Sequence, residues 1–181
     1  MKFRRKLSGI MVALVVLAMG LGALAWYTSQ PADLDLAKLA PAETRDSVPG
    51  TELSLSIRGT ALDLTFSNHS DVRLESGAAV DGDRNLYFTG GLQVLLDGQW
   101  YVMPSEAYAT AGVGLELQPG DSVSGSYYLT PYGDLPDGTY RIAFDYRQTS
   151  PSADDPLMHH PYHQSYARFD VETGRYVIPN S

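Results

Sequence analysis

Three of the chain's four histidines have the residue type and spacing for metal chemistry. His159, His160 and His163 lie close together, a few residues after Asp154 and Asp155. Neutral imidazole suits zinc, copper or nickel, so His160 and His163 could meet one metal ion. A closed zinc site, however, needs four ligands, usually held in place by further hydrogen bonds. We favour a solvated loop with incidental histidines, and we assign no metal site.

The loop that carries these histidines, residues 148–164, is long and polar and holds three prolines. Loops on a rigid β-framework often form recognition surfaces. Tyr162, and Tyr166 just beyond it, would then supply the contact area. This loop is therefore an alternative candidate for binding a partner.

Two shorter polar stretches match known motifs in part. Asp81, Asp83 and Asn85 have the spacing of the first calcium ligands of an EF-hand loop, but the later glycine and acid of that loop are missing. The tripeptide Asn68-His69-Ser70 is a glycosylation sequon. It also has the composition of a polar turn that ends a strand. We expect both stretches to be turns.

Motifs of known catalytic sites are absent from the sequence. It has no Gly-x-Ser-x-Gly elbow, no His-Glu-x-x-His pair and no glycine-rich phosphate loop. It also has no cysteine, which removes disulfides, thiolate metal ligands and thiol catalysis. We therefore expect no enzymatic activity, no catalytic residue and no cofactor.

Charge is distributed unevenly along the chain. The formal net charge is −8, yet Lys2, Arg4, Arg5 and Lys6 all lie within the first six positions. The remainder holds nine basic and 21 acidic residues, a formal charge of −12. An acidic surface of this kind repels phosphate backbones, so nucleic acid is not an expected partner.

The uncharged, apolar run from residue 7 to residue 27 follows the basic cluster. A spanning helix needs about 20 such residues, and Trp26 and Tyr27 end the run as aromatics do at a membrane interface. Basic residues before the run predict a single-pass anchor with everything after it outside the cell membrane. The alternative is a signal peptide cleaved near Ala25, which leaves a secreted protein. Both interpretations export the domain.

The remaining chain divides into a linker, one domain and a short tail. The linker contains Pro31, Pro41 and Pro49 with charges between them, and we expect a plain spacer. The expected segments are a basic cytoplasmic segment (1–6), a transmembrane anchor or signal peptide (7–27), a stalk (28–50), a folded domain (51–175) and a tail (176–181).

Strict alternation of apolar and polar residues predicts β-strands throughout the folded domain. Gly59-Thr60 fits a type II′ turn. Such a turn pairs Ile57 with Leu62 and Leu55 with Leu64, which places their apolar side chains on one face. Further strands are expected at 92–96, 99–103, 113–117, 123–129 and 168–171. Residues 77–85 are expected to form an excursion between strands.

The stretch 135–146 is a turn that leads into a core strand. Tyr140, Ile142, Phe144 and Tyr146 alternate with Arg141 and two other residues, which predicts a strand buried on one face. A Tyr at the start of such a strand is typical of the tyrosine corner, in which the hydroxyl bonds to the backbone. The fold class is all-β, most simply a two-sheet antiparallel sandwich preceded by a transmembrane or signal helix.

The hairpin around Asp97-Gly98 has two candidate registers. A two-residue turn places Trp100 opposite Leu95, on the face away from Val94. A three-residue loop aligns Trp100 with Leu96 and buries it with the fuller apolar face. We expect the longer loop, with Trp100 in the core.

Two motifs carry a family resemblance over about residues 51–171. They are Asp97-Gly98-x-Trp100-Tyr101-x-x-Pro104 and Leu135-Pro136-x-Gly138-x-Tyr140-Arg141-Ile142, supported by 64–71 and 117–122. Their order resembles a bacterial immunoglobulin-like domain family of exported, membrane-tethered proteins. The departures from its pattern are 77–85 and 148–164.

The resemblance implies an immunoglobulin-like sandwich without enzymatic activity, and it carries over no functional site. The expected function is an extracellular binding or scaffolding module held at the membrane through residues 7–27. Its partner would be an extracellular protein or glycan. The alternatives are a sandwich similar to the BsuPI type of proteinase inhibitor, which shares a similar order of motifs, and an exported metal-binding protein.

Overall fold

The structure is a computed structural model that describes residues 38–81, 83–105, 111–149 and 161–179. The predicted basic segment and anchor, residues 1–27, lie outside the described residues. Within the described ranges, none of the helical segments is both long and apolar enough to cross a membrane.

Almost all regular structure in the described residues is β-strand, which confirms the all-β prediction. One short 3-10 turn, Thr130–Tyr132, follows the ninth strand. The strands are β1 (Ala40–Pro41), β2 (Thr51–Arg58), β3 (Ala61–Asn68), β4 (Leu74–Val80), β5 (Leu86–Tyr87), β6 (Gly91–Leu96), β7 (Gln99–Val102), β8 (Ala111–Leu117), β9 (Ser122–Tyr127), β10 (Gly138–Gln148), β11 (His163–Glu172) and β12 (Arg175–Val177).

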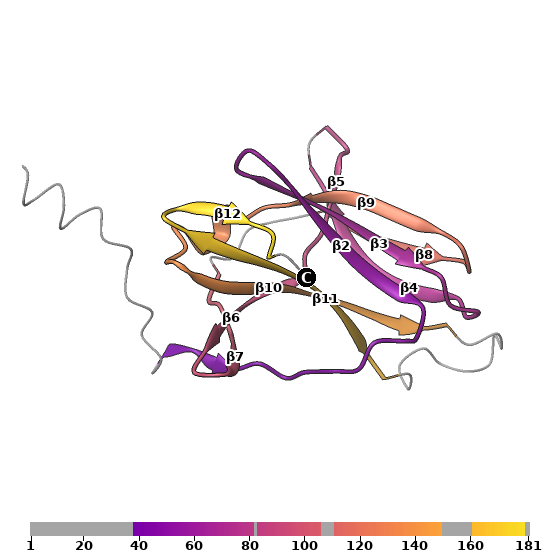
Figure 1. Cartoon of the computed structure of the whole chain (residues 1–181). Coiled ribbons are helices and arrows are strands. Elements are labelled where there is room, and N and C mark those ends of the chain that lie inside the picture. The colour runs from indigo at the N-terminus through magenta and orange to yellow at the C-terminus, as the bar shows by residue number, and fades with distance from the viewer. Residues whose placement is uncertain (1–37, 82, 106–110, 150–160, 180–181) are drawn as a thin grey trace, which may run out of the picture. The chain divides into compact units, whose positions relative to one another are not determined.

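The longest strand, β10, organises the sheet (Figure 1). Along one side it pairs antiparallel with β11 from Gly138 to Tyr146. Along the other side it pairs first with β6 and then with β4. β4 also pairs with β8 and with β5. From β5 the sheet continues through β9 and β3 to β2. All of these pairings are antiparallel except that of β5 with β9.

The predicted hairpin of β2 and β3 is confirmed in detail. Ile57 pairs with Leu62 and Leu55 with Leu64, and Gly59 has the positive φ of 66° that the turn needs. This hairpin packs on β10, because the Phe66 ring centroid lies 4.8 Å from that of Phe144. Aromatic contacts of this kind add to the burial of apolar area that holds the hairpin against β10.

The predicted tyrosine corner is also present. The Tyr140 hydroxyl donates a hydrogen bond to the Pro136 carbonyl at 2.8 Å. Burial, and next the charge of Asp137, raises the pKa of Tyr140 to about 12. The hydroxyl therefore ties the turn before β10 to the strand itself.

The prediction that β10 is buried on one face is wrong. Arg141 and Ala143 are buried as well as the apolar row. The expected three-residue loop is also wrong: Asp97 and Gly98 both have positive φ in a two-residue turn, and Trp100 pairs with Leu95. Trp100 therefore lies on the outer face, over Arg141, rather than in the core. Its indole covers the buried guanidinium of Arg141. The expected register is chosen for the apolar residues on one face, and that criterion does not account for a cation–π contact.

Three boundaries differ from those expected. Residues 77–80 belong to β4 instead of an excursion, and β11 begins at His163 rather than near residue 168. β12 lies partly in the predicted tail. Ala78 and Ala79 are both buried, so β4 lacks the alternation that marks a half-exposed strand.

The second half of the predicted stalk is part of the fold. We call residues 39–48 the strap. Its strand β1 pairs with β7, and Leu39, Ala42 and Val48 are buried. The Val48 amide donates to the Tyr146 hydroxyl at 3.0 Å. In Figure 1 the strap runs from β1 to the start of β2 along the lower edge of the sheet.

Candidate functional site

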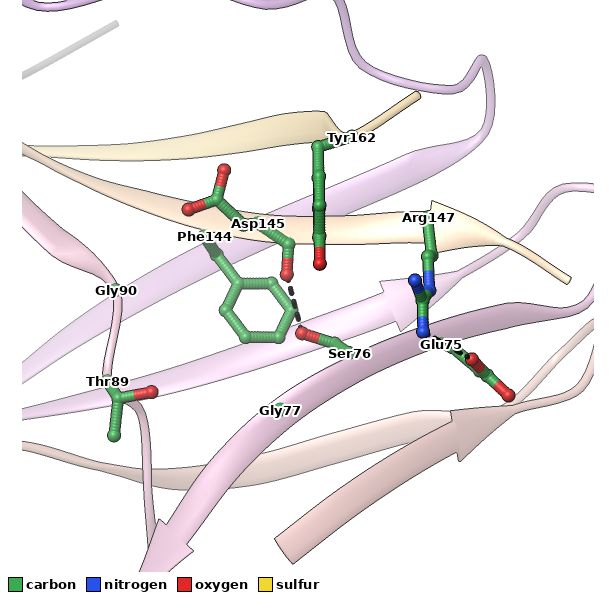
Figure 2. Close-up of a pocket in the computed structure, with 9 residues that line it drawn as sticks. All are labelled: Glu75, Ser76, Gly77, Thr89, Gly90, Phe144, Asp145, Arg147 and Tyr162. Atoms are coloured by element: carbon green, nitrogen blue, oxygen red, sulfur yellow. Dashed lines mark hydrogen bonds and ion pairs between the residues drawn. The ribbon is translucent and has the colours of Figure 1, made fainter. Parts of the chain in front are cut away.

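A cleft of about 320 Å³ opens beside the middle of β10 (Figure 2). Its walls come from strands that are far apart in the sequence: β4 on one side, the segment leading into β6 on the other, and β10 behind. Tyr162, just before β11, stands at its rim. The lining residues are Glu75, Ser76, Gly77, Thr89, Gly90, Phe144, Asp145, Arg147 and Tyr162.

The cleft exists because two strands share one edge of β10 without meeting. β6 pairs with β10 up to Ala143, and β4 pairs with it from Tyr146 onward. Phe144 and Asp145 therefore have no strand partner on that side. The Ser76 hydroxyl donates to the Asp145 carbonyl and fills part of the gap in the ladder (Figure 2). This bond gives the Asp145 carbonyl a partner at the point where the ladder is interrupted.

Two glycines line opposite walls of the cleft and have different surroundings. A Cβ built on Gly90 would lie 2.3 Å from the Ala143 carbonyl oxygen, so only glycine fits where this segment crosses β10. A Cβ on Gly77 meets no atom within 4 Å, and its φ is not positive. Gly77 therefore leaves the cleft open, whereas Gly90 permits the close approach of two backbones.

The charged groups around the cleft are paired. An Arg147 nitrogen lies 3.5 Å from the Glu75 carboxylate. The Asp145 carboxylate points away from Ser76 (Figure 2) and accepts a 2.8 Å bond from the Gln164 amide. An Arg45 nitrogen approaches the same carboxylate at 3.6 Å. The cleft therefore offers charged hydrogen-bonding groups to a ligand, while the charges within each pair cancel.

At the rim of the cleft, the ring of Tyr162 lies near the arginine of each ion pair. Its ring centroid lies 5.8 Å from the Arg45 guanidinium carbon and 5.9 Å from that of Arg147. The side chain is 51% exposed. Its hydroxyl points toward the cleft in Figure 2. The ring is thus both oriented by two cations and accessible to a ligand.

A second unusual cluster lies on the outer face of β10 and β11. Arg141 is only 5% exposed. Its guanidinium carbon lies 4.3 Å from the Trp100 ring centroid and 4.0 Å from that of Tyr166. Nε donates to Gln93 at 2.7 Å and Nη2 to the Thr44 hydroxyl of the strap at 3.0 Å. Burial lowers the pKa of Arg141, and the nearby Arg168 lowers it further.

The residues predicted as metal ligands are only partly described. His159, His160, Asp154 and Asp155 lie outside the described residues. His163 is described, and its Nδ1 lies 3.2 Å from the Asp46 carbonyl. In the described part of the chain, we find no group of three or more His, Asp and Glu side chains placed to hold a metal ion.

The stretch with partial calcium-ligand spacing is a turn built on Asp81. Its Oδ1 accepts the backbone amides of Asp83 and Asn85, and its Oδ2 accepts the Asn85 side-chain amide. Hydrogen bonds from Asn85 lower the pKa of Asp81. The carboxylate therefore serves the turn itself, as in an Asx turn.

The glycosylation sequon is a turn as predicted, and its asparagine is fully buried. The Asn68 side-chain amide donates to the carbonyls of Val72 and Leu117, at 2.9 and 3.2 Å. Its Oδ1 accepts the Ser70 amide and hydroxyl. Attachment of a sugar replaces one of the two hydrogens on Nδ2, so at least one of the two donated bonds would be lost.

Among the cleft residues, sequence reasoning selected only Tyr162 as a candidate for binding. The others sit on β4, on β10 or in the segment before β6, which the sequence pattern either missed or treated as framework. Gly77 and Gly90 gave the one available signal, because a glycine beside a strand often marks the close approach of another backbone. The signal did not say which strands would approach each other.

Comparison with protein-family models finds no match to this chain, and no curated protein matches its sequence.

Proposed function

We propose that this protein is a non-enzymatic, extracytoplasmic binding module, tethered to the membrane by residues 7–27 and built on an immunoglobulin-like sandwich. The observation that carries the binding role is the cleft beside β10. It places paired charges, hydroxyls and an exposed tyrosine around a preformed space. Small, largely preformed clefts with a few convergent polar groups are the usual form of ligand sites.

Three features support the immunoglobulin-like architecture. The Tyr140 hydroxyl bonds to the Pro136 carbonyl, as in the tyrosine corner of such domains. The β2–β3 hairpin packs against β10 through Phe66 and Phe144. Among the described residues, all strand pairings but that of β5 with β9 are antiparallel. These features support the architecture that the family resemblance of the two sequence motifs implies.

The tether and the location outside the membrane are supported by the sequence pattern. Basic residues precede an apolar run of spanning length, and the acidic remainder follows it. The strap then joins the domain within a dozen residues of Tyr27. A domain joined to a membrane anchor by so short a segment of chain would meet its ligands at the cell envelope.

The test is capture from the cell envelope with the full chain, purified in mild detergent, as bait. Gly77→Leu places a side chain in the open space of the cleft, while β4 can accept it. Gly112→Leu, on β8 and outside the cleft lining, is the matched control because its Cβ also meets no atom within 4 Å. We expect a molecule retained by the natural protein and by Gly112→Leu, and lost with Gly77→Leu. Equal retention by both variants would contradict the proposal.

A further inference from the structure

We propose that the cleft beside β10 binds an uncharged saccharide unit. This inference rests on the proposed binding function and names the chemical class of its ligand. Three observations carry it: the charge balance of the cleft, the kinds of hydrogen-bonding groups that converge there, and the small number of unpaired backbone groups on the edge of β10.

Charge balance favours a neutral ligand. Arg147 faces Glu75, and the Asp145 carboxylate is engaged by Arg45 and Gln164. A cation in the cleft would compete with Arg147 for Glu75, and an anion would compete with Glu75 for Arg147. Either ion must displace part of an existing pair and be desolvated, whereas a neutral molecule adds hydrogen bonds to both partners.

The converging groups match sugar hydroxyls. A hydroxyl both donates and accepts, and vicinal hydroxyls present two such groups side by side. Glu75 is an acceptor, Arg147 is a donor, and the hydroxyls of Thr89 and Tyr162 can do either. Hydrogen bonds to the charged pair are stronger than those between neutral groups. The half-exposed Tyr162 ring adds an amphipathic surface for the C–H face of a pyranose.

The edge of β10 argues against an extended peptide. Strand addition needs a free row of backbone donors and acceptors. Only Phe144 and Asp145 lack a strand partner here, and Ser76 already occupies the Asp145 carbonyl. A cleft of about 320 Å³ lies at the small end of ligand sites. Its size suits one or two sugar units better than a strand.

The experiment is saturation-transfer NMR with the full chain in detergent micelles. The probes are glucose, galactose, mannose and N-acetylglucosamine, with glucuronate and glucosamine as charged relatives of the same ring size. We expect transfer to at least one neutral sugar, with Kd at least tenfold lower than for its charged relatives. Gly77→Leu should abolish the transfer, Gly112→Leu should keep it, and Tyr162→Ala should weaken it at least fivefold.

Three outcomes would overturn the inference. They are tighter binding of glucuronate or glucosamine, sugar binding that survives Gly77→Leu, and no sugar binding by a protein that still captures an envelope molecule through the cleft. The last outcome removes the saccharide and leaves the proposed function standing. Loss of both sugar binding and cleft-dependent capture removes the two proposals together.

Discussion

The guanidinium carbon of Arg141 lies over two aromatic rings, 4.0 Å from the centroid of Tyr166 and 4.3 Å from that of Trp100. Within the described residues, Arg141 has no carboxylate within salt-bridge distance. Its charge is held by π-electron faces, the Gln93 carbonyl and the Thr44 hydroxyl. Because Thr44 belongs to the strap, this cation also fastens residues 39–48 to the sheet.

Replacing Arg141 tests whether the planar guanidinium group contributes more to stability than the positive charge alone. We expect Arg141→Ala to lower the free energy of unfolding by roughly 3 kcal/mol, from two lost cation–π contacts and the lost packing of the side chain. Arg141→Lys keeps the charge but loses the planar fork, so it should cost about 1–2 kcal/mol. Urea unfolding followed by near-UV circular dichroism measures both. A fully stable Arg141→Lys variant would show that charge alone is needed.

The two glycines of the cleft should differ strongly in how far the same substitution lowers stability. In Gly90→Ala the new methyl meets the Ala143 carbonyl oxygen at 2.3 Å, so the backbones must separate. We expect a loss of about 3 kcal/mol or more, comparable to severe overpacking. In Gly77→Ala the methyl enters open space, and lower backbone entropy of the unfolded chain should leave stability within about 1 kcal/mol. Thermal unfolding of both variants decides this, and equal melting temperatures would contradict the close approach.

Tyr140 makes stability depend on alkaline pH. Its pKa is about 12 in the folded protein, because burial disfavours the phenolate, against about 10 in the unfolded chain. Because of this raised pKa, the Tyr140 hydroxyl keeps its proton to a higher pH in the folded state than in the unfolded chain. Stability is therefore full below pH 10 and falls as pH rises from about 10 to 12. Tyr176, whose pKa is also raised by burial, adds to the same fall.

The variant Tyr140→Phe isolates this contribution. It removes the bond to the Pro136 carbonyl, which should cost about 1 kcal/mol at neutral pH. It should also flatten part of the alkaline decline, which urea midpoints at pH 8 to 11.5 would reveal. Tyr128→Phe is a suitable control, because Tyr128 is exposed. An unchanged alkaline slope in Tyr140→Phe would contradict the assignment.

Local pattern was sufficient wherever one face of a strand is buried and a short turn sets the register. The β2–β3 hairpin followed from alternation and Gly59, and the tyrosine corner followed from the position of Tyr140. Pattern failed where both faces are covered. Arg141 and Ala143 were placed on an exposed face because nothing in the sequence around them announces the strap or Trp100.

The cleft was beyond sequence reasoning for a different reason. It arises from the point at which β6 stops pairing with β10 and β4 begins to pair with it, and both strands lie more than 40 residues before β10 along the chain. Periodicity describes each strand alone and says nothing about where two strands share a third. Tyr162 was selected for its loop and its aromatic ring, but its neighbours Glu75 and Thr89 gave no signal.

Asn68 offers a last test, because the same residue is either a modification site or a structural one. Its amide bonds two carbonyls and its oxygen accepts two bonds from Ser70, all in a fully buried position. Asn68→Ala leaves these partners unsatisfied, and we expect a loss of roughly 2–4 kcal/mol. Ser70→Ala destroys the sequon but removes fewer bonds, so it should cost about 1 kcal/mol. If Asn68 were instead a glycan carrier, intact mass would show an added sugar in the natural protein, and both variants would lose it with similar stability.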